Sequence, residues 1–205
     1  MHKEILTNKQ IELLPVLKYF SKEYLLVGGT AIALYLGHRE SIDFDLFSLE
    51  RIKRINVKNY LSGKSYKDYK LLKEEEDQLH FIINGVKLTF FQFPFILEKQ
   101  NTFDGVIGMP DLITLAAMKA LALGGRGKWK DYVDLYFLLK YHFNLNDIIT
   151  QAEKIFGASF NDKLFREQLA YFEDIDYSED VIYRTRQVEK EEIIDFLIEK
   201  ALEKF

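Results

Sequence analysis

Hydrophobic and polar residues alternate with two different periods along this chain, and the period changes near residue 109. In the first part, short alternating or apolar runs predict strands, and the Asn84-Gly85 pair between two of them predicts a tight hairpin. The expected strands cover residues 24–27, 41–47, 66–73, 79–83, 86–93 and 106–107, and the expected helices cover residues 9–19, 30–36 and 49–61.

From Pro110 onward, apolar residues recur at helical spacing only. Pro110 suits the first position of a helix, and Asp111 suits its first turn. The expected helices cover residues 110–123, 129–141, 145–156, 161–173 and 188–204. The pattern predicts an α+β fold in which a mixed β-sheet domain with flanking helices (1–109) precedes an all-helical region (110–205), with a soft boundary between them.

Composition narrows the class of protein. The 205 residues are 48% hydrophobic and 29% charged, which suits a globular protein large enough to bury a core. The chain has no cysteine, so disulfides, thiolate metal sites and cysteine nucleophiles are excluded. Because no apolar run has the length of a membrane span and no secretory signal is visible, we expect a cytoplasmic protein with no membrane partner.

Charge is unevenly distributed along the chain. The net formal charge is −4, but residues 173–205 carry 11 acidic and 5 basic residues, so the rest of the chain is weakly basic. The segment from Arg51 to Lys73, here called the basic stretch, has eight basic residues, one acid and three interleaved tyrosines. Such a segment can neutralise RNA phosphates and stack on bases. The alternative is a solvated charged face, balanced in part by the acidic residues 74–77.

A glycine pair and a carboxylate pair form the most informative motif. Gly28-Gly29 follows a predicted strand and opens a helix, and the N–H groups of such a turn can hold a phosphate. Asp43 and Asp45 lie two residues apart on the next predicted strand, so both carboxylates face the same side of the sheet. Their mutual repulsion is offset by a divalent cation, and Mg²⁺ prefers oxygen ligands. A phosphate-binding turn beside metal-binding carboxylates is typical of sites for phosphoryl or nucleotidyl transfer.

Four segments together resemble a known family. They are residues 26–31 (LVGGTA), 37–47 (GHRESIDFDLF), 118–121 (MKAL) and 126–136 (RGKWKDYVDLY). They resemble the nucleotidyltransferase superfamily, and most of all the AbiEii/AbiGii toxin family, the toxin halves of abortive-infection toxin–antitoxin pairs. The resemblance spans about residues 20–140.

The resemblance implies a small nucleotidyltransferase-like mixed sheet that carries Mg²⁺ (or Mn²⁺) on Asp43 and Asp45, and a helical region that helps hold a nucleotide. It places Gly29 and Thr30 beside the triphosphate, and Lys119 and Asp131 at later motif positions. The expected catalytic residues are Asp43, Asp45, Lys119 and Asp131. The expected nucleotide-binding residues are Gly28, Gly29, Thr30, Arg39, Lys119, Arg126 and Asp134.

One feature departs from the superfamily pattern, in which a third carboxylate lies on a later strand of the same sheet. The candidate strand, residues 85–93, contains neither Asp nor Glu, and Thr89 or Gln92 occupies the expected place. Neither side chain carries the charge for a second metal ion or acts as a good general base. One-metal catalysis, a base from elsewhere such as Asp131 or Glu76, and nucleotide binding without transfer all remain open.

The predicted helix 110–123 is apolar nearly all round, with Lys119 in its middle, so this lysine needs a buried anion. The anion is either a nucleotide phosphate or a carboxylate of Asp131 or Asp134, which share a helix face. Arg39 likewise either pairs with aspartates or touches phosphate. The cationic loop 124–130, which includes Arg126, either closes on a triphosphate or merely joins two helices.

The sequence therefore predicts a Mg²⁺-dependent nucleotidyltransferase of the toxin–antitoxin type, which transfers NMP from an NTP to a hydroxyl acceptor. The resemblance implies tRNA or another RNA as one acceptor and a cognate antitoxin as a partner. Two alternatives stay open: a nucleotide-binding module that has lost catalysis, and a nucleotidyltransferase that modifies a small molecule such as an aminoglycoside.

Overall fold

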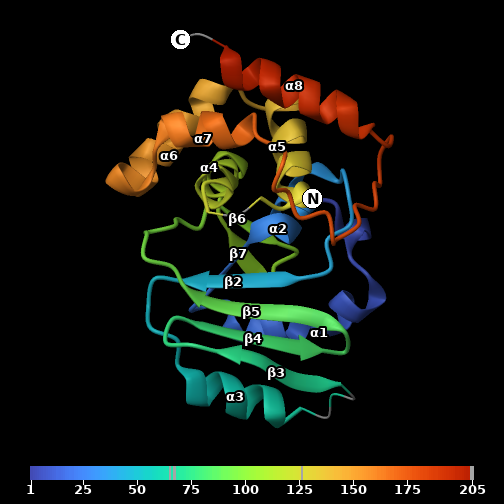
Figure 1. Cartoon of the computed structure of the whole chain (residues 1–205). Coiled ribbons are helices and arrows are strands. Elements are labelled where there is room, and N and C mark those ends of the chain that lie inside the picture. Colours follow the sequence, from blue (N-terminus) through green and yellow to red (C-terminus); the bar gives the residue numbers. More distant parts are fainter. Residues whose placement is uncertain (65, 67, 126, 204–205) are drawn as a thin grey trace.

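A mixed sheet runs through the centre of the molecule, with a group of helices at one end of it (Figure 1). The structure is a computed structural model that describes residues 1–64, 66, 68–125 and 127–203. Among these residues the sheet has seven strands in the order β3-β4-β5-β2-β1-β7-β6. The strands are β1 (Leu25–Val27), β2 (Phe44–Ser48), β3 (Tyr69–Glu74), β4 (Gln78–Ile83), β5 (Val86–Gln92), β6 (Asn101–Phe103) and β7 (Ile107–Met109). Strand β2 runs parallel to β5, and β1 runs parallel to β7.

The helices fall into two groups. In the first part of the chain they are α1 (Asn8–Phe20), α2 (Gly28–Leu36) and α3 (Arg54–Ser62). In the second part they are α4 (Leu112–Leu123), α5 (Trp129–Tyr141), α6 (Leu145–Phe156), α7 (Asp162–Leu169) and α8 (Lys190–Leu202). The predicted α+β fold, a mixed sheet followed by helices, is confirmed. Across the described residues, no helix is long and apolar enough to cross a membrane.

The Asn84-Gly85 turn fixes the register between β4 and β5. Asn84 and Gly85 both have positive φ, 51° and 80°, as a two-residue turn of this kind requires. Ile83 is paired with Val86, and the pairing continues in step along both strands. The expected hairpin is therefore present at the expected residues.

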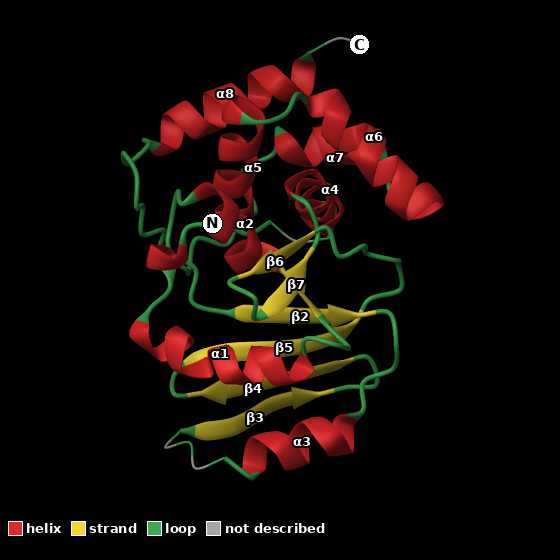
Figure 2. Ribbon diagram, turned by 180° about the vertical axis from the view of Figure 1, so that it is seen from behind, coloured by secondary structure: helices red, strands yellow, loops and turns green. Residues whose placement is uncertain are grey.

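Alternation along these strands gives the sheet two unlike faces. Helix α1 lies across the rear face, as the view from behind shows (Figure 2). Phe81, Leu88 and Phe90 are fully buried there, and the ring of Phe20 from α1 meets that of Phe90 edge-on at 4.9 Å. The intervening residues of β2, β5 and β4 face the front and are more polar. The front face is therefore free to carry chemistry.

The two parts of the chain share one hydrophobic core cluster. Helix α2 packs against both α4 and α5, and β7 joins the sheet beside β1. The division at residue 109 therefore falls at the end of a strand that belongs to the sheet. A boundary there between a sheet domain and a helical region stays a prediction.

The structure corrects several element boundaries. The strand expected at 41–47 begins at Phe44, and the helix expected at 49–61 begins at Arg54. Strand β6 was not expected, because its short, mostly exposed sequence has no apolar alternation; it pairs with β7 through a turn in which Asp104 and Gly105 have positive φ. An Asp-Gly pair is a hairpin signal, so the sequence does contain a mark of this turn.

Candidate active site

The two aspartates lie on the front face of the sheet, at the start of β2. Asp43 directly precedes the strand and Asp45 is its second residue, while Phe44 between them is fully buried. Burial raises the pKa of Asp43 above its ordinary value, and the Asp45 carboxylate adds to this, whereas the Lys87 ammonium opposes it. A group of like charges held in a partly buried place favours a cation between them.

The Gly28-Gly29 turn lies against the carboxylate of Asp45. Gly28 has a φ of 73°, and a methyl group added to it would overlap Oδ2 of Asp45. A methyl group on Gly29 would lie 2.7 Å from Nη2 of Arg39. The N-cap residue of α2, Val27, offers no side-chain cap to the first-turn N–H groups. Glycine is thus required by close approach, and the amide end of α2 is left facing the site.

The side chain of Thr30 is buried at the start of α2. Its side chain is 1% exposed, and its hydroxyl donates to the backbone carbonyl of Asp43 and lies 2.8 Å from Oγ of Ser41. The Thr30 side chain therefore ties α2 to the segment that carries Asp43, instead of facing the open site. A phosphate role for residue 30 would fall to its backbone N–H group.

Strand register separates Thr89 from Gln92, the two residues expected where the superfamily has a third carboxylate. In the parallel pairing of β2 with β5, Thr89 is directly opposite Asp45, whereas Gln92 is opposite Ser48 at the far end. Register thus favours Thr89 of the two candidates, since it is the one beside Asp45. Within the described residues, no three Asp, Glu or His side chains come together as a metal-binding group.

The later motif residues form a buried ionic network. Asp134, fully buried on α5, accepts hydrogen bonds from Nε and Nη2 of Arg39 at 2.7 and 2.8 Å. Nζ of Lys119 on α4 lies 2.5 Å from Oδ1 of Asp131 and 3.1 Å from Oδ2 of Asp134. Nε2 of His38 lies 2.8 Å from Oδ1 of Asp134. The network joins the turn after α2 to α4 and α5.

The charges of this network stabilise one another. Burial alone would raise the pKa of Asp134, but the Arg39 and Lys119 cations hold that pKa well below its ordinary value. Burial alone would lower the pKa of Lys119, but Asp131 and Asp134 raise it. Burial lowers the pKa of His38, so a neutral imidazole donates from Nε2 to Asp134. The carboxylate alternative for the partner of Lys119 is therefore realised with both aspartates, and the Arg39 head group is occupied inside the protein.

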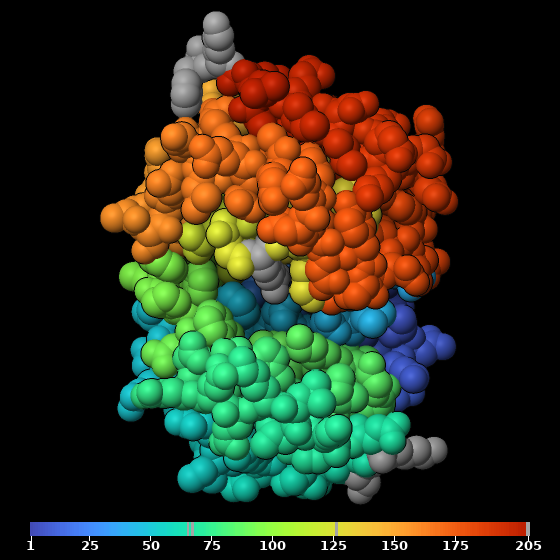
Figure 3. Space-filling view, in the orientation of Figure 1, coloured from blue at the N-terminus to red at the C-terminus, as the bar shows by residue number. Residues whose placement is uncertain are grey.

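A cleft of about 470 Å³ opens between the front face of the sheet and the helical part, and a hollow at this level is visible in Figure 3. Gly28, Asp45 and Thr89 line its floor, and Lys119 borders it from α4. Its remaining lining residues are Ile32, Phe47, Gln78, His80, Lys87, Phe91, Phe93, Leu115, Met118, Leu121, Ala122 and Gly125. The cleft therefore brings together Gly28 at the start of α2, Asp45 on β2 and Lys119 on α4.

A segment near the C-terminus, residues 174–184, here called the strap, crosses over two parts of the site. Its backbone is bonded to the cationic loop through Gly127 and Trp129, and to the turn after α2 through His38 and Glu40. Its Glu179 lies 2.5 Å from Lys128 and 3.1 Å from Lys130. These cations are therefore neutralised in this state. Arg126, the other cation expected to meet a triphosphate, lies outside the described residues.

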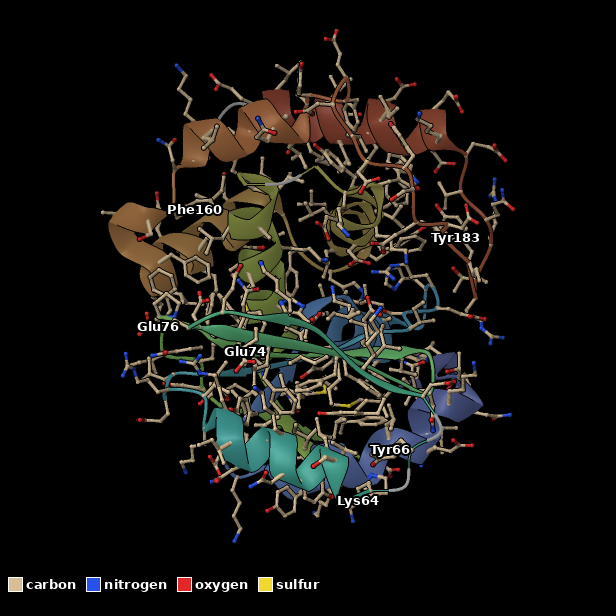
Figure 4. The ribbon with its side chains drawn as sticks, turned by 60° about the horizontal axis from the view of Figure 1, so that its bottom comes forward. Lys64, Tyr66, Glu74, Glu76, Phe160 and Tyr183 are labelled. Carbon is tan, nitrogen blue, oxygen red and sulfur yellow. The ribbon has the colours of Figure 1, made fainter. Side chains whose placement is uncertain are left out.

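The basic stretch lies by α3 and the edge strand β3, at the end of the sheet away from the helical part (Figure 1). Lys64 and Tyr66 lie beyond the end of α3, and Glu74 and Glu76 lie on the hairpin at the other end of the strands (Figure 4). Several of its cations are paired with carboxylates: Arg51 with Glu76, Lys53 with Glu23, Lys58 with Glu74 and Lys73 with Glu75. Lys67 lies outside the described residues. The solvated-face alternative thus gains support, and RNA contact stays a prediction.

Sequence reasoning missed two features of the site, His80 on the cleft floor and the strap. The Asn84-Gly85 turn already implies that His80 faces Thr89, because the hairpin register runs outward in step from Ile83 and Val86. The strap has no comparable signal, since the segment has neither regular periodicity nor a motif.

Similarity to known proteins identifies the family of this chain. Residues 91–203 match the model of the nucleotidyl transferase AbiEii toxin family of type IV toxin–antitoxin systems. The chain belongs to the AbiEii family. The match begins after Asp43 and Asp45 but includes Lys119, Asp131 and Asp134. An uncharacterized protein of Aquifex aeolicus is 29% identical over 188 residues, covering 88% of this chain and 87% of that protein.

Two solved structures share the fold of this AbiEii family member. MenT4, a nucleotidyltransferase toxin of Mycobacterium tuberculosis, has a TM-score of 0.65 at 13% identity and covers 94% of this chain and 81% of its own. JHP933 of Helicobacter pylori has a TM-score of 0.57 at 20% identity and covers 96% of this chain and 91% of its own. The expected family is confirmed, and the chain is classed with the nucleotidyltransferases.

Proposed function

We propose that the cleft binds an NTP together with Mg²⁺ and transfers the NMP group to a hydroxyl acceptor. One observation supports this above all: the uncapped amide end of α2 lies so close to the metal strand that Gly28 has no room for a side chain beside Asp45. An uncapped helix end, which can hold an anion, and the Asp45 carboxylate thus meet at one point. In the reaction, the acceptor oxygen forms a bond to the α-phosphorus while the bond to the β-phosphate oxygen breaks, and pyrophosphate leaves.

The donor set fits Mg²⁺, with Mn²⁺ as the alternative ion. Asp43 and Asp45 supply hard oxygen ligands. Burial raises the pKa of Asp43, and the Asp45 carboxylate raises it further. When bound, the ion would neutralise phosphoryl oxygens and orient the α-phosphate. The protein contributes the α2 amides, which hold the triphosphate, and Thr30, which keeps Asp43 in place.

The buried network has a positioning role in this proposal. Lys119 reaches the cleft edge while its ammonium is held by Asp131 and Asp134, so a phosphate contact requires this pair to open. Arg39 braces the Gly29 turn from inside the protein. Asp131 and Asp134 therefore act through the two cations that they hold.

Calorimetry on Asp43→Asn and Asp45→Asn tests the metal and nucleotide assignment. Mg²⁺·NTP binding should be lost in both variants while the fold is kept, and the thermal stability of the apo protein should stay level or rise, because a repulsion is removed. Asp104→Asn, in the exposed β6–β7 turn, is the matched control. Unchanged Mg²⁺·NTP affinity in both site variants would refute the assignment.

The acceptor is tested separately with NTPs labelled at the α-phosphate. Total RNA, purified tRNA and an aminoglycoside panel are offered in parallel. Membership of a toxin–antitoxin family favours an RNA acceptor and a cognate antitoxin partner, so label is expected in the RNA fraction and should be lost with Asp45→Asn. Label on an aminoglycoside alone would establish the small-molecule alternative.

One observation favours a second candidate function, a module that binds NTP without transferring it. Thr89 stands opposite Asp45 where the superfamily has its third carboxylate, and a hydroxyl does not replace that charge. This candidate predicts Mg²⁺·NTP binding with no transfer to any acceptor in the panel.

A further inference from the structure

A row of polar side chains crosses the front face of the sheet at the level of the metal strand. Asp45 on β2 is opposite Thr89 on β5, and Thr89 is opposite His80 on β4. Residues directly opposite one another on neighbouring strands share a face, and in an antiparallel pair such as β4 and β5 their Cβ atoms lie about 4.5–5.5 Å apart. Thr89 has no charge, so His80 is the titratable residue that follows Asp45 along this row. Asp45 and His80 both line the cleft.

Hydrogen bonding orients the His80 ring. Nε2 lies 2.7 Å from Oε1 of Gln78, two residues earlier on the same face of β4. Nε2–H donates to this amide oxygen, which leaves the lone pair on Nδ1. Nδ1 lies 3.5 Å from Oγ1 of Thr89, so it is turned toward the row that leads to Asp45. A nitrogen acceptor therefore points along the cleft floor.

The surroundings keep this imidazole neutral. Partial burial lowers the pKa of His80, and the ammonium groups of Lys87 and Lys73 lower it further, against the weaker opposite effect of Asp45 and Glu75. A neutral histidine near pH 7 can accept a proton, whereas a threonine hydroxyl cannot. The site thus contains a base where the strand pattern of the sequence lacked one.

The two bases considered from the sequence are less suited to this task. Asp131 is buried and holds Lys119 at 2.5 Å. Glu76 lies on the β3–β4 turn, its side chain is 74% exposed, and it is paired with Arg51. Neither of them lines the cleft as the structure describes it.

We propose that His80 takes over the role of the missing third carboxylate and accepts the proton of the acceptor hydroxyl. This rests on the proposed nucleotidyl transfer. The acceptor O–H bond breaks, its proton moves to Nδ1 of His80, and the oxygen forms the bond to the α-phosphorus as pyrophosphate departs with the electron pair of the broken P–O bond. Gln78 holds the ring in the tautomer that this step needs, and it is a positioning residue.

The decisive test compares His80→Gln, Thr89→Asp and the double variant in the transfer assay. His80→Gln should lower kcat by about 10²–10⁴-fold, the usual contribution of a general base, with the Kd for Mg²⁺·NTP within about twofold of wild type. Thr89→Asp restores the carboxylate of the superfamily pattern, so the double variant should recover at least about tenfold over His80→Gln. His142→Gln, an exposed histidine at the end of α5, is the matched control.

Melting curves separate a folding defect from a chemical one, because each variant is assayed below its own transition. A kcat for folded His80→Gln near that of wild type would overturn the role of His80 and leave nucleotidyl transfer intact. Failure of Thr89→Asp to rescue a folded, NTP-binding double variant would also overturn it. Absence of transfer by the wild type to every acceptor and to water would overturn both proposals together.

Discussion

The carboxylate of Asp134 and the guanidinium of Arg39 form a two-pronged ion pair in a place where neither side chain is more than 2% exposed. The two residues are 95 positions apart in the chain. The ion pair joins the turn between α2 and β2 to helix α5. Loss of this ion pair should therefore lower the free energy of unfolding and change the geometry of the cleft.

Asp134→Asn should destabilise the protein by about 3–5 kcal/mol at pH 7, because two buried cations lose a shared carboxylate. The folded-state pKa of Asp134 lies below its ordinary value, so its contribution is present above about pH 4 and is lost as pH falls through the lowered pKa. In urea unfolding, the difference in free energy of unfolding between wild type and Asp134→Asn should be constant from pH 8 to about 5 and smaller below about 4. A difference that disappears near neutral pH would contradict this origin.

Lys119→Met should lower stability by several kcal/mol, since Met fills the space but leaves Asp131 and Asp134 without their shared ammonium. Because Lys119 also borders the cleft, NTP affinity of the folded variant should fall by about tenfold, the loss of about 1.4 kcal/mol. Calorimetry well below the transition measures the second effect. A large drop in Tm with nucleotide affinity preserved would assign Lys119 a structural role alone.

Gly28→Ala should displace Asp45 and abolish transfer, because the new methyl group overlaps its carboxylate. The backbone penalty for a positive φ is expected to cost about 1 kcal/mol in addition. Gly105→Ala is a matched control, since Gly105 also has a positive φ, 62°, but no neighbour within 4 Å. Equal effects of both changes on activity would mean that close approach at Gly28 is unimportant.

Charge reversal at Lys53, Arg54 and Lys58 tests the basic stretch as an RNA face. RNA affinity should fall with salt by a log–log slope of roughly −0.7 per phosphate contact, and the triple Glu variant should flatten that slope for all RNA sequences alike. NTP binding should survive, because α3 lies at the far end of the sheet from the helices that border the cleft. Loss of NTP binding with RNA binding unchanged would place these residues in the nucleotide site.

The parts of the fold set by local chemistry could be predicted from sequence. Asn84-Gly85 fixes a hairpin through its positive φ values, and the apolar pattern of α4 indicates a buried helix. Gly28, Gly29, Asp43 and Asp45 were singled out because a glycine pair after a predicted strand precedes two aspartates on the next one, and because these segments resemble a known family. Their roles in metal and nucleotide binding remain proposals.

The parts that depend on long-range pairing were not predictable. Thr89 and Gln92 could not be separated from the sequence because the parallel register of β2 and β5 is set by packing between distant elements. Lys119 had three possible anions, and only the tertiary arrangement brings Arg39, Asp131 and Asp134 together around it. Thr30 illustrates the same limit, since its hydroxyl is bonded to the segment that carries Asp43.

The strap has a consequence for how this protein is made. During synthesis the N-terminal part leaves the ribosome first, and this part includes the Gly28-Gly29 turn and strand β2. The backbone partners of His38 and Glu40, at residues 182 and 184, emerge almost 150 residues later. A nascent chain thus carries residues 28–45 long before the strap residues that bond to the turn after α2. A product that ends before residue 182 lacks both of these backbone partners, so the turn after α2 is held in place only once the strap has been synthesised.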